Sequence, residues 1–451
     1  MNNVMRVVVA ALSALALASG AAEAADLGSR DQKRTSVSKR SVKRPTEATS
    51  LALSPKVFSV ALYEDALVNA LENTTGYGGD WGGYAYAIYQ NGKLLRSGAA
   101  GVARYSPHVA WTPDTPFSMM STGKTITAAA YVQLIAERED ISLGSPITPF
   151  LPDGWNPDPH LAPVTFRHLL SHTSGLTTGT DPWSGVKIQV ETNVRPAGST
   201  ALDGNGNVVP AGVGSFFYSN TNFTLGRVMM AYMLDLPQAQ MMEGLGAGDL
   251  YSASVYRSRV LSSIFAPIGL DSSKVDVQPI GQNPAGFYGL VPLEDSGWSL
   301  LAWYFEPTDG STIRNSGAGF WNLSVKSYGK FIDALSHGQY TVVTNGATID
   351  PWEHMTRMVD ATNSTMVGLG LFRVTGAYGD YYTHNGGWSN GSAGACSRWM
   401  TYPNGVSAVW VANAVVRDAN GNTQCRVANE GQMMIDAYDN AWTTIVRPIK
   451  P

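Results

Sequence analysis

The sequence predicts an α+β fold, with one antiparallel sheet built from both ends of the chain and flanked by helices, and a mostly helical subdomain inserted between those ends. Three observations predict it: strand-like segments with hairpin turns near residues 84–98 and 366–415, helical periodicity between them, and an amphipathic helix that closes the chain. The 451 residues are 44% hydrophobic and 15% charged, which is typical of a folded globular protein. We place the folded domain at 57–446, with its α/β part at about 57–116 and 364–446 and its helical part at about 117–363.

The first 24 residues have the pattern of an export signal. Arg6 ends a short basic segment, an apolar run extends from Val7 to Ala18, and Ala22-Glu23-Ala24 is a small-x-small cleavage site. The apolar run is shorter than a helix that spans a bilayer. We therefore expect a periplasmic or secreted protein without a stable membrane anchor.

Residues 25–56 are predicted to form a basic flexible linker. Seven basic residues lie between Arg30 and Arg44, and Asp31 is the only acid among them. Such a composition favours a solvated linker, and contact with an anionic polymer or lipid headgroups is the alternative. Because the net charge of the whole chain is −4, the remainder is acidic, which argues against nucleic acid as a substrate.

The folded part begins with a predicted hairpin. Tyr84–Tyr89 alternates as a strand does, Gln90-Asn91-Gly92-Lys93 is typical of a type I′ turn, and residues 94–98 begin the return strand. A proline-containing loop then leads to a helix that begins near Ser121. Its apolar positions follow helical spacing, which predicts one buried face: Ala128, Tyr131, Val132, Ile135 and Ala136.

The middle of the chain is predicted to be helical, apart from one long loop at 177–214 that we expect to border the binding site. Short and longer helices are expected at 165–175, 225–234 and 324–335. Later strands are expected at 367–374, 381–383, 395–401 and 406–415. The last helix would bury one apolar face, made of Met434, Ala437, Tyr438, Ala441 and Ile445.

The chain has two cysteines, Cys396 and Cys425. An exported protein encounters an oxidising compartment, which favours a disulfide between them. Two buried free thiols are the alternative, and neither residue has a local motif typical of a catalytic cysteine.

Two histidines, His168 and His172, have the i, i+4 spacing that can hold zinc on a helix. The spacer lacks the glutamate of His-Glu-x-x-His, and no third ligand is suggested nearby. We therefore interpret the pair as structural, and expect neither a metal nor a cofactor.

The strongest candidate for chemistry is Ser121-Thr122-Gly123-Lys124. On a helix, positions i and i+3 share a face, so the Lys124 amine would lie beside the Ser121 hydroxyl and activate it as a nucleophile. Three other Ser-x-x-Lys matches are less suitable: Ser36 lies in the linker, Ser184 in the predicted loop, and Ser327 inside a helix rather than at its start.

Two further segments complete a possible active site. As a base near neutral pH, Lys124 needs a pKa well below its reference value of about 10.4. Tyr218-Ser219-Asn220 offers a phenol for proton transfer and an amide for substrate binding. His384-Asn385-Gly386-Gly387 follows a strand, and its glycines allow close backbone approach to a substrate and an oxyanion.

A competing pattern is Gly387-Trp388-Ser389-Asn390-Gly391, which matches the Gly-x-Ser-x-Gly nucleophile elbow. That arrangement needs a helix after the serine and a later histidine. Strands follow instead, and His384 is the last histidine of the chain, so we reject it.

The three segments resemble, in order, the motifs of the penicillin-recognising serine hydrolases, and most closely the class C β-lactamase-related branch with its D,D-peptidases, D-aminopeptidases and esterases. The stretch from Arg167 to Leu176 and the Gly317-Ala318-Gly319 segment also resemble this branch. The resemblance covers about residues 57–446 and implies a β-lactamase-like fold.

The resemblance also implies roles. Ser121 would be acylated, with Lys124 as its base partner and Tyr218 as the proton carrier. Asn220 would bind the substrate carbonyl or amide, together with the edge formed by His384, Asn385, Gly386 and Gly387. The backbone N–H groups of Ser121 and Gly387 would form the oxyanion hole.

Two departures from the family pattern bear on the substrate. His384 replaces the usual lysine, so the site carries less fixed positive charge, and Asn385 replaces a threonine that helps to bind a carboxylate. We therefore expect an ester, amide or peptide substrate, cleaved by an esterase or by a D-amino-acid peptidase or amidase. A β-lactamase, a D-Ala-D-Ala carboxypeptidase and a non-catalytic penicillin-binding sensor are the alternatives.

Overall fold

The computed structural model describes residues 56–73, 82–177, 183–203, 206–280, 285–292, 298–304, 311–344, 347–364, 366–417, 423–425, 427 and 429–444. The predicted export signal lies outside the described residues, as does the predicted linker except for Lys56, which begins the first strand.

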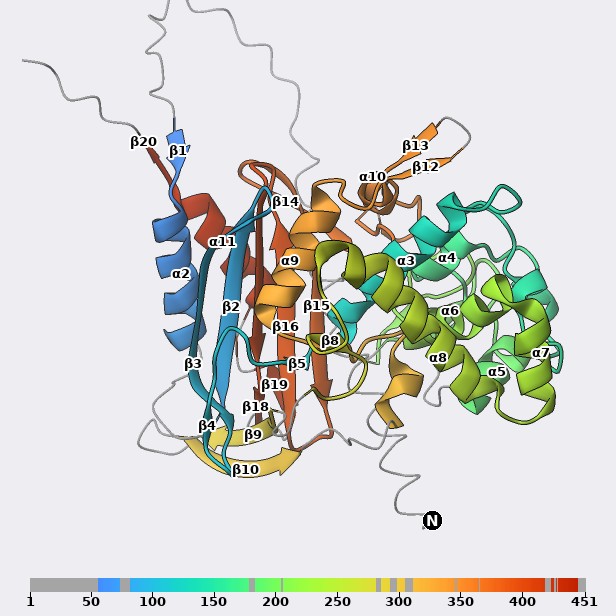
Figure 1. The fold of residues 1–451 in the computed structure, drawn as a ribbon, viewed down its shortest axis with the longest axis horizontal. Helices are drawn as coiled ribbons and strands as arrows, with labels where there is room; N and C mark the ends of the chain where they lie inside the picture. The colour runs from blue at the N-terminus through green and yellow to red at the C-terminus, as the bar shows by residue number, and fades with distance from the viewer. Residues whose placement is uncertain are drawn as a thin grey trace, which may run out of the picture.

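A large antiparallel sheet forms the centre of the molecule, as Figure 1 shows. Its central strands lie side by side in the order β14-β15-β16-β17-β2-β3, so both ends of the chain contribute to it, and the predicted α+β fold is confirmed. These strands are β2 (Gly83–Gln90), β3 (Lys93–Arg104), β14 (Phe372–Gly376), β15 (Gly379–Ser389), β16 (Gly394–Thr401) and β17 (Val406–Ala412).

The sheet is buried on both faces because its strands alternate between two cores. In β2, Tyr84, Tyr86 and Ile88 join one core, and Ala85 and Ala87 join the other. The turn that follows β2 has left-handed backbone at Asn91 (φ 51°) and Gly92 (φ 83°), as the predicted type I′ hairpin requires.

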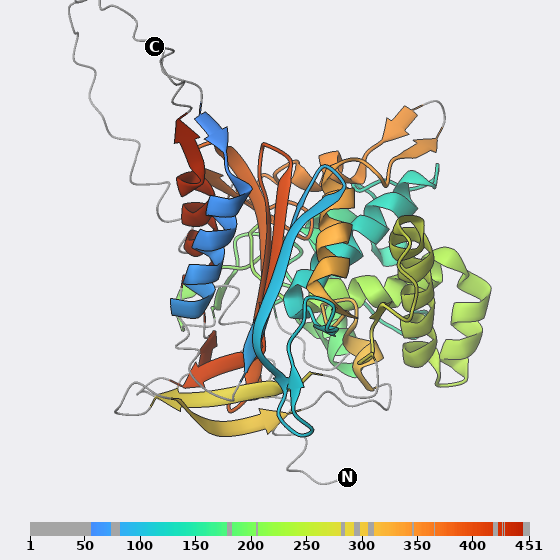
Figure 2. The ribbon, with the colours of Figure 1, turned by 60° about the vertical axis from the view of Figure 1, so that its left-hand side comes forward.

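One face is covered by two helices from opposite ends of the chain, α2 (Val60–Asn73) and α11 (Glu430–Asn440). Beside them β1 (Lys56–Phe58) pairs with β20 (Trp442–Thr444), as Figure 2 shows. The sequence analysis assigned no element to α2. The last helix ends at Asn440, earlier than predicted, because the chain then enters β20; Ile445 lies outside the described residues.

The other face is covered by α9 (Val325–Ser336) and by α3 (Lys124–Ala136), beyond which the helical subdomain lies (Figure 1). The single buried face predicted for α3 is wrong, since nearly every residue from Lys124 to Ile135 is buried. This helix lies between the sheet and the other helices, so it has no solvent-exposed side. The subdomain helices are α4 (Phe166–Leu170), α5 (Ser184–Thr192), α6 (Asn220–Leu234), α7 (Leu236–Gly244) and α8 (Gly248–Val260).

The middle of the chain also supplies strands to the large sheet. Strand β9 (Phe287–Pro292) pairs with β10 (Trp298–Tyr304) and contacts β16, and it runs parallel to β18 (Ala414–Arg417). Shorter elements complete this part: β4 (Val109–Ala110), β5 (Phe117–Ser118), β6 (Thr200–Leu202), β7 (Val208–Pro210), β8 (Val275–Asp276), β11 (Asn322–Leu323), β12 (Val342–Thr344), β13 (Ala347–Ile349) and α10 (Pro351–Thr356).

Three predicted segments differ from the structure. Residues 367–371 form a turn before β14 rather than a strand. The strand expected at 406–415 is divided into β17 and β18 at Asn413, whose side chain accepts a hydrogen bond from Gly83 N at 2.7 Å. The loop expected at 177–214 contains α5 and the β6–β7 hairpin.

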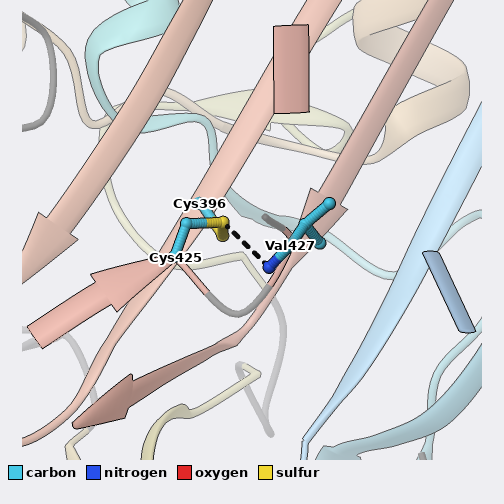
Figure 3. The surroundings of a disulfide bond; sticks show 3 residues. All are labelled: Cys396, Cys425 and Val427. Atoms are coloured by element: carbon cyan, nitrogen blue, oxygen red, sulfur yellow. Dashed lines mark hydrogen bonds between the residues drawn. A yellow bond between two sulfur atoms is a disulfide. The ribbon is translucent and has the colours of Figure 1, made fainter. Parts of the chain in front are cut away.

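Cys396 and Cys425 form a disulfide, with their Cα atoms 5.8 Å apart (Figure 3). The bridge joins β16 to β19 (Thr423–Cys425), and Val427 N donates a hydrogen bond to Cys425 Sγ at 3.4 Å. Cys396 lies opposite Gly387 of β15, so the bridge anchors the strand next to the predicted oxyanion segment. Within the described ranges no helix is long and apolar enough to cross a membrane.

We predict that the double variant Cys396→Ala/Cys425→Ala has a free energy of unfolding lower by about 3 kcal/mol. The reason is that the bridge closes a loop between cysteines 29 positions apart in the sequence. Urea unfolding followed by tryptophan fluorescence measures this difference. A reducing agent should give the intact protein the same midpoint as the double variant. Equal midpoints for the oxidised protein and the variant would contradict the prediction.

Candidate active site

Ser121 lies in a 3₁₀ turn, Met120–Gly123, that leads directly into α3. The prediction that the α-helix begins near Ser121 is therefore wrong by three residues, since a 3₁₀ turn precedes the α-helix, which begins at Lys124. Met120, just before the serine, has a left-handed backbone (φ 48°), which is uncommon outside glycine and often marks functional sites. Ser121 itself is only partly buried, so a substrate can reach it.

The turn is held from several directions. Met119 N donates to Trp321 O at 2.8 Å, and Met119 O accepts from Ser397 Oγ of β16 at 2.9 Å. Tyr328 of α9 donates its hydroxyl proton to Thr122 O at 2.7 Å. Hydrogen bonds from the sheet and from a helix thus fix the backbone on both sides of Ser121.

Lys124 has no exposed surface, and its Nζ donates a hydrogen bond to Ala318 O at 2.6 Å. The ion pairs of the described residues include no carboxylate at this amine. Burial therefore lowers the pKa of Lys124 well below 10.5. A neutral amine with a free electron pair is what a general base requires.

Tyr218 lies next to Ser121 and Lys124. Its hydroxyl interacts with the Ser121 side chain, and Lys124 Nζ lies 5.0 Å from the centre of its ring. Burial raises the pKa of Tyr218, so the phenol keeps its proton at neutral pH. The structure thus brings together the three residues for which the sequence predicts catalytic roles.

Asn220 is the first residue of α6, after the N-cap residue Ser219. Its Oδ1 atom is buried and accepts no hydrogen bond from the residues that the structure describes. A buried amide oxygen without a donor is unusual in a folded protein. It is consistent with the predicted role of Asn220 in binding a substrate amide.

The predicted substrate edge lies on β15. Strand β14 pairs with β15 only as far as Thr383, so within the described sheet His384–Ser389 pair through β16 alone. A Cβ atom added to Gly386 would lie 3.1 Å from Ser121 N and 2.8 Å from Met119 O. The absence of a side chain at Gly386 therefore lets the strand approach the nucleophile turn. Asn385 and Gly387 lie on the same edge, opposite Arg398 and Cys396 of β16.

His384 is neutral, which differs from the partial charge expected from the reference pKa of histidine. Burial, with smaller effects of Lys124 and Arg398, lowers the pKa of His384 to about 3. Its Nδ1 donates to Asn385 O at 2.5 Å, so its Nε2 is a buried acceptor, and that atom has no hydrogen-bond donor among the described residues. The lysine of the family motif is thus replaced by an uncharged ring.

The two histidines of the possible zinc motif have separate roles. His168 forms a capping box with Thr165 at the start of α4, and His172 lies against Tyr218 with its ring centre 4.5 Å away. The described part of the chain has no group of three or more metal-ligating side chains. The role of His172 beside Tyr218 is not predicted from the sequence, although its position in the Arg167–Leu176 stretch was a signal.

The other serines are arranged differently from Ser121. Ser389 ends β15 and accepts a hydrogen bond from Gly391 N at 2.9 Å in a turn that leads into β16, so no helix follows it as an elbow requires. Ser184 begins α5 rather than lying in a loop, which corrects the prediction. Lys187, however, pairs with Glu191 rather than with a serine hydroxyl.

The chain is similar to several known proteins. A family model described as Beta-lactamase matches residues 68–428. Esterase EstB of Burkholderia gladioli is 34% identical over 136 residues, a segment that covers 29% of this chain and 30% of that esterase. This chain therefore spans less than a third of that relative.

Two solved structures have a similar fold. The D-amino acid amidase of Ochrobactrum anthropi SV3 is 19% identical, with a TM-score of 0.56 over 84% of this chain and 99% of that one. The D-stereospecific amidohydrolase of Streptomyces sp. is 21% identical, with a TM-score of 0.54 over 83% and 98%. Since the family model covers most of the residues that form the sheet and the site, the chain belongs to the Beta-lactamase family and is a hydrolase of that family.

Proposed function

We propose that the protein hydrolyses a small ester or amide through an acyl-enzyme formed on Ser121. The observation that carries the proposal is the Lys124 amine, which is buried, has no carboxylate partner among the described residues and has a lowered pKa. An uncharged lysine next to a tyrosine that interacts with the serine is suited to accept a proton from the serine.

In the first step, Ser121 Oγ forms a bond to the carbonyl carbon, and its proton passes to the Lys124 amine by way of the Tyr218 hydroxyl. The oxyanion is stabilised by the backbone N–H groups of Ser121 and Gly387. The proton then moves through Tyr218 to the leaving alcohol or amine, and the carbon–oxygen or carbon–nitrogen bond breaks. Water releases the acyl group by the same route in reverse.

The protonation state of His384 supports a substrate without an essential carboxylate. The neutral ring offers an acceptor at Nε2 and no positive charge. β-Lactam hydrolysis and D-Ala-D-Ala carboxypeptidase activity depend on recognition of a carboxylate, so they are less favoured. Ester cleavage is chemically easiest, because an alcohol leaves more readily than an amine.

The similarity to Esterase EstB further supports the ester as the first candidate. An amide of a D-amino acid is the second candidate, because the unpartnered Asn220 Oδ1 can accept a hydrogen bond from a substrate N–H. A penicillin-binding sensor would also have to recognise the carboxylate of a penicillin, so the neutral His384 makes it less favoured.

We also propose that the protein is exported. The signal pattern of residues 1–24 supports export, and the Cys396–Cys425 bridge is typical of oxidising compartments.

We predict that Ser121→Ala abolishes hydrolysis of p-nitrophenyl esters and D-amino acid amides, because no acyl-enzyme can form. Mass spectrometry after treatment with a fluorophosphonate should place the adduct on Ser121 in the parent protein. Ser389→Ala is the matched control and should keep both labelling and turnover. Labelling of Ser389, or hydrolysis that survives Ser121→Ala, would contradict the proposal.

We predict that kcat/KM for an ester rises with pH and levels off well below pH 10.5. The active form has neutral Lys124, whose pKa is lowered, so activity appears as pH rises through that pKa. Stopped-flow or steady-state rates between pH 5 and 10 measure this limb. His384→Asn should keep it, because the pKa of His384 is about 3 and the ring does not titrate in this range. If the rising limb of the pH–rate profile shifted in His384→Asn, the titrating base would not be Lys124, and the prediction would be contradicted.

We predict that Gly386→Ala lowers kcat/KM about 100-fold, since the new Cβ would lie 2.6 Å from Ser397 Oγ and 2.8 Å from Met119 O and would displace the strand or the nucleophile turn. Gly244→Ala, where an added Cβ has no neighbour within 4 Å, is the control and should leave ester turnover unchanged. Parent-like activity of Gly386→Ala would show that the approach of β15 to Ser121 is not required.

A further inference from the structure

His172 contacts the Tyr218 segment in three separate ways. Its carbonyl oxygen accepts a hydrogen bond from Phe217 N at 2.9 Å, and its Nδ1 accepts one from Ser219 N at 3.1 Å. Its ring lies 4.5 Å from the Tyr218 ring, with the two planes 29° apart. One residue thus holds the backbone on both sides of Tyr218 and the phenol ring itself.

His172 is itself held in place. The side chain is 3% exposed, and Asn222 Nδ2 lies 3.3 Å from its Nδ1. Asn222 in turn accepts a hydrogen bond from Ser174 Oγ at 2.5 Å. The backbone of His172 is left-handed (φ 57°), a conformation that a histidine keeps only where its surroundings fix it.

The hydrogen bonds define the state of the ring. Because Nδ1 accepts from Ser219 N, the ring is neutral and carries its proton on Nε2. Burial lowers the pKa of His172 well below 6.5, which is consistent with a neutral ring. A protonated ring would lose this acceptor and would bring a positive charge close to the catalytic base.

We propose that His172 is a positioning residue that holds the Tyr218 hydroxyl on Ser121 during acylation. The inference rests on the proposed function, in which Tyr218 carries the proton between Ser121 and its base. A displacement of about 1 Å in such a group is enough to slow catalysis about 100-fold. The two hydrogen bonds of His172 limit movement of the backbone on either side of Tyr218, and the ring contact limits movement of the phenol ring.

Two substitutions separate the contacts. His172→Phe keeps an aromatic ring against Tyr218 but removes the acceptor for Ser219 N. His172→Asn keeps an acceptor and tolerates the left-handed backbone, but it removes the ring. Each should lower the rate constant of the acylation burst with a p-nitrophenyl ester about 10- to 100-fold per titrated active site, with the substrate dissociation constant little changed.

His168→Asn is the matched control, because it is also a histidine-to-asparagine substitution, four residues earlier. It removes the capping contact of His168 with Thr165 at the start of α4, which has no part in positioning Tyr218. It should change the unfolding midpoint in urea and leave the acylation rate per active site unchanged. If His172 had only a structural role, all three variants would change the unfolding midpoint and leave the acylation rate per active site unchanged.

The decisive measurement is a double-mutant cycle with Tyr218→Phe. If His172 acts through Tyr218, His172→Phe and His172→Asn cause no further loss in the Tyr218→Phe background. Additive losses, or parent-like acylation in both single variants, overturn the role of His172 while fluorophosphonate still labels Ser121. Unchanged hydrolysis in Ser121→Ala overturns the proposed function itself, and this inference with it. His172→Asn alone completes the cycle where His172→Phe does not fold.

Discussion

A lysine amine without exposed surface constrains the rest of this structure. The charged form of Lys124 would be expensive to bury, and the residues described around it supply a carbonyl oxygen rather than a carboxylate. The fold therefore stabilises the neutral amine. The α3 helix must be enclosed on all sides for this to hold, which explains why both the sheet and the helical subdomain pack against it.

The same enclosure explains why the nucleophile turn is fixed by distant parts of the chain. Thr125 donates to Gly370 O at 2.8 Å, just before β14, and Thr127 donates to Gly317 O at 2.6 Å. With the contacts of Met119 and Thr122, the α3 start is attached to four separate segments: residues 317–321, α9, the residues just before β14, and β16. Side chains held in this way need little reorganisation during reaction, which is the usual source of electrostatic catalysis.

Local patterns in the sequence were sufficient to predict the hairpin at Asn91-Gly92, helix α9 and the residues Ser121, Lys124 and Tyr218 as a group. Helix α2 was missed although Tyr63, Leu67 and Leu71 have helical spacing and are fully buried. The pairing of β9 with β16 and β18 depends on contacts between distant segments, which no local pattern encodes.

The neutral state of His384 could not be predicted from the sequence either, because it also depends on contacts between distant segments. Burial is the main cause of the lowered pKa of His384, and two rings pack against this side chain, those of Phe372 at 5.2 Å and Tyr218 at 6.3 Å between ring centres. Arg398 of β16 lowers the pKa further. These groups come from separate segments of the chain. A histidine in the place of a lysine therefore changes the site more than its reference pKa suggests, since it removes the charge entirely and leaves an acceptor. Under the proposed function, selection among acyl donors at this edge would then depend on hydrogen bonding and shape rather than on attraction of an anion.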